Sequence, residues 1–304
     1  MRHRDFSKDL KEYVERNPKL VKTRNIGNGL QILKYTRHVF FKGLWDEYLE
    51  ECRGTVVDSD FNVVSRPFTK IYNYGIDKDS PQFSDDTVVD ACRKVNGFLI
   101  NVSMYNGELI VTSSGSASSP HVDMAMEYIS EIRDRLREFL RYTDPDYTMM
   151  FECVHPDDPH IIKEEPGLYL LGLRENSWYS DVIYQPSALL PIALSIGVSV
   201  PFCHHDVSIG TLKEMNRAAD HEGFVFYTKD GQSAKMKSPY YLVAKFLARL
   251  GNTDRLFEKN VDKRVDEEFY PLIKAVRESV DEFKELDEQE RLAWINHYMM
   301  EMVS

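Results

Sequence analysis

The sequence predicts an α+β fold with predominantly antiparallel sheets, followed by a small all-α module. Two strand-like runs, residues 98–104 and 108–112, flank Asn106-Gly107, a pair that favours the tight turn of a hairpin. More strand-like runs follow, separated by turn signals. After Pro239 the apolar residues recur at helical spacing instead. Hairpins followed by helices indicate this class.

The first region, to about residue 85, is predicted to be an N-terminal subdomain. It opens with a polar helical stretch at residues 5–16 and turns at residues 25–29, which read Asn-Ile-Gly-Asn-Gly. Strand-like runs follow at residues 30–35 and 54–58. We expect this extension and the next region to form one domain.

The second region, residues 86–238, mixes both types of secondary structure. A helical pattern covers residues 121–142 and ends at Thr-Asp-Pro. Four further strand-like segments lie at residues 147–154, 168–173, 224–227 and 233–236. This region carries the hairpin and is the main source of the antiparallel prediction.

The third region, residues 239–304, is predicted to be a helical C-terminal module. Apolar residues at helical spacing predict helices over residues 240–250, 267–280 and 288–300. The tail is also acidic, because residues 251–304 hold 14 Asp and Glu against 8 Lys and Arg. We expect residues 239–304 to fold as a module separate from the preceding domain.

Composition limits the classes of function. The chain has 304 residues, 42% of them hydrophobic, and a formal net charge of −11. These values predict a globular protein and exclude a generally basic nucleic-acid coat. If the chain binds RNA, its positive charge must be gathered locally, since phosphate contacts supply much of the affinity.

Cysteine spacing and hydropathy point to a soluble intracellular protein. The four cysteines contain no Cys-x-x-Cys pair, so neither a zinc site nor a disulfide framework is predicted. No run of about 18 apolar residues exists, and the N-terminus lacks the apolar core of a signal peptide. We expect reduced thiols and no membrane association.

The segment Lys94-Val95-Asn96-Gly97 stands directly before a predicted strand. Gly97 would allow the backbone to approach a bound nucleotide closely. Alone, the segment is more typical of a surface lysine before a turn than of a nucleotide-binding site. Its interpretation therefore depends on residues further along the chain.

Further charged elements occur in a fixed order. They are Phe151-Glu152, then the run Tyr-Leu-Leu-Gly-Leu-Arg at residues 169–174, then Glu222-Gly223, and finally Lys235 and Lys237. Each has an ordinary alternative: the acids could be exposed strand ends and the two lysines a solvated strand face. The order of all of them together favours a shared site.

Together these elements resemble the covalent nucleotidyltransferase superfamily of DNA ligases, RNA ligases and mRNA capping enzymes. The resemblance implies Lys94 as the covalent nucleophile, Glu152 as a ribose contact and Glu222 as a Mg²⁺ contact through water. Other residues implied at the nucleotide are Val95, Gly97, Gly223, Lys235 and Lys237. It also implies an antiparallel-sheet nucleotidyltransferase domain.

The chemistry requires these residue types. A lysine attacking the α-phosphorus of ATP must be unprotonated, and we expect neighbouring Lys235 and Lys237 to lower the pKa of Lys94. The attack forms a phosphoramidate. Charge developing on the phosphates calls for cationic side chains and a divalent metal, Mg²⁺ or Mn²⁺.

Two upstream segments narrow the choice within the superfamily. Glu-Cys-Arg-Gly-Thr at residues 51–55 and Ser-Arg-Pro-Phe-Thr-Lys-Ile-Tyr-Asn at residues 65–73 resemble segments of the phage-type RNA ligase 1 family. The resemblance implies ATP phosphate contacts from Arg53 and Lys70, and aromatic neighbours of the nucleotide at Tyr35 and Tyr72. Ordinary alternatives are a strand-end arginine, a surface lysine and core aromatics.

The chain departs from that family in three places. Asn96 replaces a more frequent aspartate. Ser114 stands where the family has a basic residue, so the phosphate contact of that position is left open. The tail after Pro239 is shorter than a tRNA-recognising C-terminal domain, and it could be a stabilising cap or an RNA-selecting module.

The resemblance predicts an ATP-dependent RNA ligase that works through lysyl-AMP and RNA-adenylate intermediates. Its partners would be RNA 3′-hydroxyl and 5′-phosphate ends, with RNA repair as the setting. The RNA itself could be a cleaved tRNA, another broken structured RNA or a free single strand. We expect a monomer in the cytoplasm, or in the infected host's cytoplasm if a phage encodes it.

Two alternatives are kept. A capping-type guanylyltransferase would use GTP, but such enzymes append a β-barrel where this chain turns helical. The second alternative is a nucleotide- or RNA-binding regulator that has lost catalysis. The lysines and glutamates of all the motifs are present in this chain, which argues against it. Cys203-His204-His205 is interpreted as a polar loop, and His155 and His160 are assigned no role.

Overall fold

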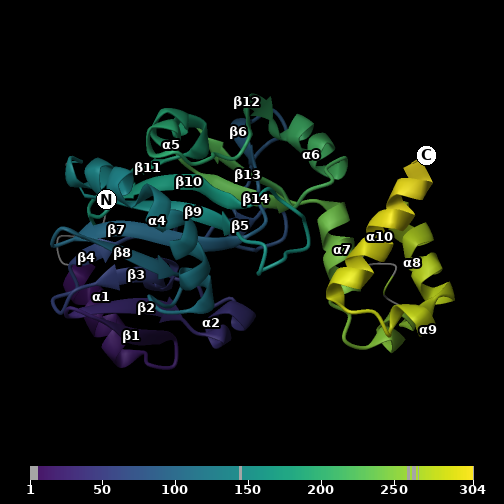
Figure 1. Cartoon of the computed structure of the whole chain (residues 1–304), viewed down its shortest axis with the longest axis horizontal. Coiled ribbons are helices and arrows are strands. Elements are labelled where there is room, and N and C mark those ends of the chain that lie inside the picture. Colours follow the sequence, from purple (N-terminus) through teal and green to yellow (C-terminus); the bar gives the residue numbers. More distant parts are fainter. Residues whose placement is uncertain (1–5, 144–145, 259–260, 262–264, 266, 304) are drawn as a thin grey trace.

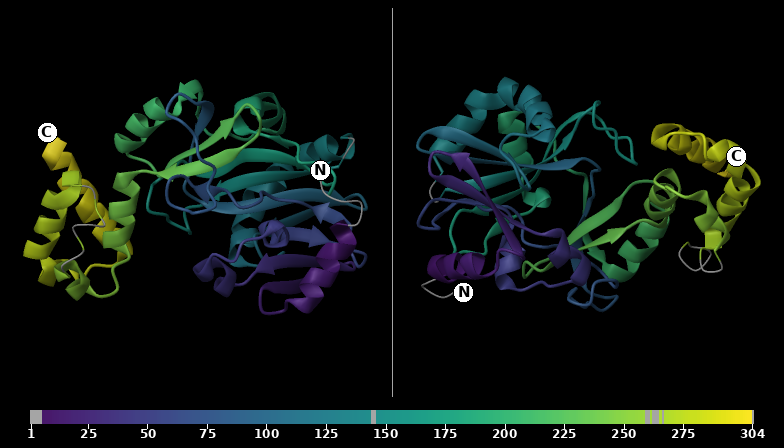
Figure 2. Two further views of the ribbon diagram at one scale, coloured as in Figure 1. Left: turned by 180° about the vertical axis from the view of Figure 1, so that it is seen from behind. Right: turned by 90° about the horizontal axis from the view of Figure 1, so that it is seen from below.

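The structure is a computed structural model that describes residues 6–143, 146–258, 261, 265 and 267–303. It confirms the α+β prediction: three mostly antiparallel sheets are followed by a group of helices. Figures 1 and 2 show the sheets gathered in one body and the C-terminal helices beside it.

The first sheet belongs to the N-terminal region. Its strands, in spatial order, are β1 (Val21–Gly27), β2 (Leu30–Tyr35), β3 (Arg53–Val57) and β4 (Val63–Ser65). Helix α1 (Phe6–Arg16) packs on it through Phe6, Leu10 and Val14, which recur at helical spacing. The short helices α2 (Arg37–Lys42) and α3 (Glu47–Glu51) connect β2 to β3.

The second sheet contains the predicted hairpin. Its strands, in spatial order, are β11 (Ile183–Tyr184), β10 (Gly167–Glu175), β9 (Tyr147–Val154), β7 (Phe98–Tyr105) and β8 (Glu108–Ser113). The turn between β7 and β8 has positive φ at both Asn106 (50°) and Gly107 (80°), as the sequence predicts. Helices α4 (Pro120–Arg141) and α5 (Leu190–Ile196) cover this sheet and complete its hydrophobic core.

The third sheet joins segments that are far apart in the chain. In spatial order it contains β12 (Cys203–Ser208), β6 (Val88–Arg93), β13 (Gly223–Thr228), β14 (Ser233–Lys237) and β5 (Tyr72–Asn73). Only the β14–β5 pair is parallel among the described strand pairs. Helix α6 (Ile209–Arg217) packs on this sheet.

The C-terminal helices have a hydrophobic core of their own. They are α7 (Pro239–Ala248), η2 (Thr253–Phe257), η4 (Glu267–Phe269), α8 (Tyr270–Glu278), α9 (Val280–Phe283) and α10 (Glu288–Val303). Ile161 and Ile162, from a loop after β9, are buried in the same core. This contact joins the helices to the body that carries the sheets. Among the described residues, no helix is long and apolar enough to cross a membrane.

Candidate active site

Lys94 follows the last residue of β6 and lies beside the start of β13. Its backbone N–H donates to Gly223 O at 2.8 Å, so the two segments are joined directly. Its ammonium Nζ donates to Glu222 Oε2 at 2.9 Å. The adjacent pairing of β6 and β13 therefore brings together a lysine and a glutamate 128 residues apart.

Glu222 is the hub of this cluster and is only 2% exposed. Its Oε2 also accepts from Asn96 Nδ2 at 2.8 Å, while its Oε1 faces Lys237 Nζ at 3.2 Å. Asn96 in turn accepts from the backbone N–H of Ile162 at 2.9 Å. The residue that departs from the family pattern thus positions the central carboxylate.

The predicted lowering of the Lys94 pKa is wrong for this state. Burial alone favours the neutral amine, but the nearby Glu152 and Glu222 carboxylates outweigh it and raise the pKa of Lys94. The lowered group is Lys235 instead: burial and the charges of Lys94 and Arg53 bring the pKa of Lys235 to about 8.

Two glycines are required by backbone contacts at the site. A Cβ on Gly97 would lie 2.2 Å from Cys153 O, and one on Gly223 would lie 2.1 Å from Met236 O. Gly223 also has a φ of +118°. The Gly97 N–H donates to Glu152 Oε1 at 3.0 Å, and burial raises the pKa of Glu152.

A cavity of about 320 Å³ opens beside Lys94. Its cationic walls include Arg53, Lys94 and Lys235, and Glu152 is its carboxylate. Its apolar and aromatic walls include Tyr35, Phe68, Leu99, Leu171, Val225 and Tyr227. A polar, cationic side and an apolar side suit the phosphates and the base of a nucleotide respectively.

Arg53 and Lys70 both pack against aromatic rings. The guanidinium of Arg53 lies 5.4 Å from the ring centre of Tyr35, and Trp45 also contacts both cations. Lys70 Nζ lies 3.8 Å from the Tyr72 ring centre. Arg53 and Tyr35 line the cavity, whereas Lys70 and Tyr72 are not among its wall residues.

Lys70 and Tyr72 are also engaged elsewhere. Lys70 Nζ lies 3.4 Å from Asp77 Oδ2, and the Tyr72 hydroxyl donates to Glu50. In this structure both side chains therefore contact carboxylates and neither lines the cavity.

A lysine from another strand lies beside Ser114, where the family has a basic residue. Lys34, on β2, donates from Nζ to Ser114 Oγ at 3.2 Å. A Cβ on Gly115 would meet the Lys34 side chain at 2.6 Å, so the lysine packs directly on this turn. A cation is therefore present beside Ser114, but it comes from another strand.

A buried ion cluster supports the segments that carry Arg53 and Lys70. Glu51 Oε1 lies 3.0 Å from Arg66 Nη2 and 2.9 Å from Arg174 Nη2, and all three side chains are almost fully buried. All three lie within segments that resemble the family, but no sequence pattern connects them. The cluster fastens α3 and the segment after β4 to β10.

Tyr241 and Lys245, on the helix that follows β14, lie near Lys237 and were not predicted as site residues. The ammonium of Lys237 lies 4.8 Å from the ring centre of Tyr241, and Lys245 Nζ donates to the Tyr241 hydroxyl at 3.4 Å. Their only sequence signal is the helical spacing that places them on one face of α7.

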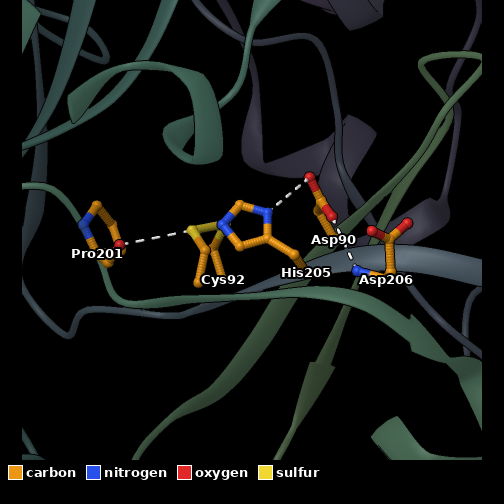
Figure 3. The surroundings of a disulfide bond; sticks show 6 residues. Asp90, Cys92, Pro201, His205 and Asp206 are labelled. Atoms are coloured by element: carbon orange, nitrogen blue, oxygen red, sulfur yellow. Dashed lines mark hydrogen bonds and ion pairs between the residues drawn. A yellow bond between two sulfur atoms is a disulfide. The ribbon is translucent and has the colours of Figure 1, made fainter. Parts of the chain in front are cut away.

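The expectation of reduced cysteines is contradicted at one pair. Cys92 on β6 and Cys203 on β12 stand directly opposite each other and form a disulfide (Figure 3). The spacing rules could not find this pair because 111 residues separate the two cysteines. Cys52 and Cys153 are free and buried.

None of the four histidines singled out in the sequence lines the cavity beside Lys94. His204 and His205 lie on β12 and not in the predicted polar loop, and His205 Nδ1 lies 3.4 Å from Asp90 Oδ2 (Figure 3). His155 Nε2 lies 3.1 Å from Glu127 Oε2, and His160 Nε2 lies 3.0 Å from Asp158 Oδ2.

The donor set at Glu222 fits a hydrated metal ion better than direct coordination. Each carboxylate oxygen has about two acceptor positions, and Oε2 already accepts from Lys94 and Asn96. The remaining position on Oε1 could accept from a metal-bound water, and Mg²⁺ keeps several waters in such sites.

Residues 51–246 match a family model described as RNA ligase. RNA ligase 1 of bacteriophage TS2126 is 33% identical over 134 residues, which cover 41% of this chain and 34% of that protein. The chain spans about a third of the length of the curated relatives that it matches.

Solved structures share the fold. An archaeal ATP-dependent RNA ligase, form 2, has a TM-score of 0.58 at 20% identity and covers 95% of this chain and 75% of its own. Form 1 has a TM-score of 0.58 at 16% identity and covers 97% of this chain and 98% of its own. At these identities the likeness shows the fold alone.

Proposed function

The chain belongs to the RNA ligase family, and on this premise we propose that it is an ATP-dependent ligase that joins RNA ends. The observation that carries the proposal is Lys94, whose ammonium lies in the wall of a cavity lined by Arg53 and Lys235 and is held by Glu222. A nucleophile, phosphate-binding cations and an apolar wall are the parts that this chemistry needs.

The first step would be self-adenylylation. Lys94 Nζ loses its proton, for which Glu222 Oε2 at 2.9 Å is the nearest carboxylate, and attacks the α-phosphorus of ATP. A phosphorus–nitrogen bond forms while the bond to pyrophosphate breaks. Because the Glu152 and Glu222 carboxylates raise the resting pKa of Lys94, the amine can react only after its proton has passed to a base such as Glu222.

The later steps would use the same cations. AMP passes to the 5′-phosphate of one RNA end, and the 3′-hydroxyl of another then displaces AMP to seal the strand. Each step builds charge around one phosphorus atom, which Arg53, Lys235 and Lys237 can stabilise. Glu222, through water, would hold a Mg²⁺ or Mn²⁺ ion that neutralises phosphate charge.

The other site assignments belong to the same proposal. Arg53 and Lys70 would contact the phosphates, Tyr35 would contact the nucleotide, and Glu152 would contact the ribose. Lys70 and Tyr72 would have to exchange Asp77 and Glu50 for the nucleotide. The Val95-Asn96-Gly97 backbone and Gly223 would form the floor beside Lys94.

Finer aspects are proposed on the family resemblance. We infer that residues 1–238 form the adenylylation domain and residues 239–304 a separate module, whose helices have their own core. Cleaved tRNA, a role in RNA repair, a monomeric state and a cytoplasmic location complete the proposal.

Labelling with α-phosphate-labelled nucleotide tests the function. We expect label from ATP, but not GTP, to become covalently attached to the wild-type chain and to Lys8→Ala, and not to Lys94→Ala. Label transfer to a 5′-phosphorylated RNA should follow. Labelling by GTP alone would favour the capping-type alternative, and absence of any covalent label would favour the inactive regulator. Label on Lys94→Ala would remove Lys94 from the role.

A further inference from the structure

One stretch of this acidic chain contains only positive charge. Residues 19–45 hold six Lys and Arg side chains and no Asp or Glu, although the whole chain has a net charge of −11. The stretch forms β1, β2 and α2, with Lys19, Lys22, Arg24, Arg37 and Lys42 exposed and Lys34 partly buried. Among the described residues, none of the six is ion-paired with a carboxylate.

The strand register places like charges opposite one another. Lys22 on the edge strand β1 stands directly opposite Lys34 on β2, and Lys34 stands opposite Arg53 on β3. Like charges that face each other across antiparallel strands destabilise a sheet. Two such pairs in succession, with no acid between them, need an explanation other than the stability of the fold.

The cations lead to the cavity beside Lys94. Arg53 lines that cavity together with Ser114, and Lys34 donates to Ser114 Oγ. Arg24 and Arg53 are close enough to Lys34 for their charges, after burial, to lower the pKa of Lys34. The basic surface of Lys22, Arg24 and Lys34 is therefore continuous with the nucleotide cavity.

Exposed aromatic rings accompany the cations on α2. Phe40 is 57% exposed and Phe41 is 77% exposed, between Arg37 and Lys42. Figure 1 shows α2 at the end of the first sheet that lies toward the C-terminal helices. Surfaces that bind single-stranded nucleic acid combine two features: cations along the path of the phosphate backbone, and aromatic rings on which the bases stack.

We propose that Lys22, Arg24 and Lys34, with Phe40 and Phe41, bind the backbone and bases of a single-stranded RNA whose end enters the cavity beside Lys94. The inference rests on the proposed function, because the cavity is taken as the place of reaction. These cations have no acidic partners within the described part of the chain and can therefore pair with RNA phosphates. Because they lead to the cavity, an RNA bound along them would point one of its ends at Lys94.

Charge reversal at the exposed part of the surface tests the inference. Lys22→Glu/Arg24→Glu should leave enzyme–AMP formation from ATP unchanged and weaken binding of a 5′-phosphorylated RNA oligonucleotide by on the order of tenfold at low salt. The slope of log affinity against log salt should become shallower by about 0.7 for each lost phosphate contact. Fluorescence anisotropy measures both quantities.

A matched control carries the same change of net charge elsewhere. Lys8→Glu/Lys274→Glu reverses two exposed cations away from the surface and should bind RNA as the wild type does. Phe41→Ala should weaken binding without changing the salt slope, since stacking involves no counterion release.

The outcomes separate this surface from the proposed function. Equal RNA affinity in both double variants, or an equal loss in both, would overturn the surface even if Lys94 becomes adenylylated. If the wild type is not adenylylated at all, the proposed function fails, but the RNA-binding comparison still decides the surface. An effect on binding to anionic lipid vesicles and not to RNA would also overturn it.

Discussion

The lysines around Glu222 and the lysines of β1 and β2 differ in how their charge is balanced. Lys94 and Lys237 each face an oxygen of the same buried carboxylate, and Asn96 completes its hydrogen bonds. Lys22 and Lys34 face each other across two strands instead. One region neutralises its cations within the fold, and the other leaves them available.

This difference separates two roles for positive charge. An ammonium held by a carboxylate stays fixed and protonated until it gives its proton to a neighbouring base, which suits a group that must react in one place. Cations without internal partners raise the local potential and attract a polyanion over a longer path. Substitutions that change the balance in one region at a time can separate the two roles.

The largest effect is expected on the stability of the fold, at the buried cluster in which Glu51 neutralises Arg66 and Arg174. Glu51→Gln would leave Arg66 and Arg174 buried without their shared carboxylate, so the free energy of unfolding should fall by about 3–5 kcal/mol. Urea denaturation measures the change. Glu47→Gln, on the exposed side of α3, is the control and should unfold as the wild type does. A loss below about 1 kcal/mol would show that the cluster is dispensable.

Removing the hub charge at the site should affect the reaction more than the fold. Glu222→Gln removes the carboxylate that would accept the Lys94 proton and hold the metal-bound water, and we expect enzyme–AMP formation to slow by about 10²–10³-fold. The exposed Glu165→Gln is the control. Labelled ATP measures the rate and a thermal melt verifies folding; a near-normal rate in a folded variant would remove Glu222 from the mechanism.

Lys235 should give the site a dependence on pH. Its pKa of about 8 means that it loses its charge above pH 8, so the KM for ATP should rise by up to about tenfold per pH unit. Lys235→Arg keeps the charge and should abolish this rise.

The same titration should change stability in the opposite direction. The unfolded chain binds the Lys235 proton up to its ordinary pKa of 10.5, whereas the folded chain releases it near 8. Between these values the unfolded state binds more protons, so this group makes folding more favourable as pH rises. Loss of ATP affinity with no gain in stability relative to Lys235→Arg would point to another titrating group.

Local patterns predicted much of the fold. The hairpin of β7 and β8, helix α4 and strand β9 depend on residues close in sequence, and their bounds agree with the predicted ranges within two residues. Strands β6 and β12 and helix α6 were not predicted. β6 reads Val-Val-Asp-Ala-Cys-Arg, which has no clean alternation of apolar and polar residues. β12 acquires its partner only through a pairing across more than 100 residues.

At the site, the sequence predicted residue types better than their electrostatic state. The order of the lysines and glutamates indicated that they would meet, and Lys94, Glu222 and Lys237 do lie together. The direction of the Lys94 pKa shift could not be predicted, because it depends on distances to two carboxylates that are remote in sequence, Glu152 on β9 and Glu222 just before β13. Nor could the contact of Lys34 with Ser114, which joins two sheets.

The smallest expected effect contrasts the two regions most directly. Lys22→Glu places an acid opposite Lys34, so a repulsive cross-strand pair becomes attractive and the free energy of unfolding should rise by about 0.2–1 kcal/mol. RNA affinity should fall in the same variant. Lys22→Gln, which only removes the repulsion, should lie between the wild type and Lys22→Glu in both measurements. If Lys22→Glu stabilises the fold and weakens the RNA complex, Lys22 serves binding at the expense of folding. If the variant is less stable than the wild type, Lys22 and Lys34 do not repel each other in the folded protein. Unchanged RNA affinity would show that Lys22 does not contact the RNA.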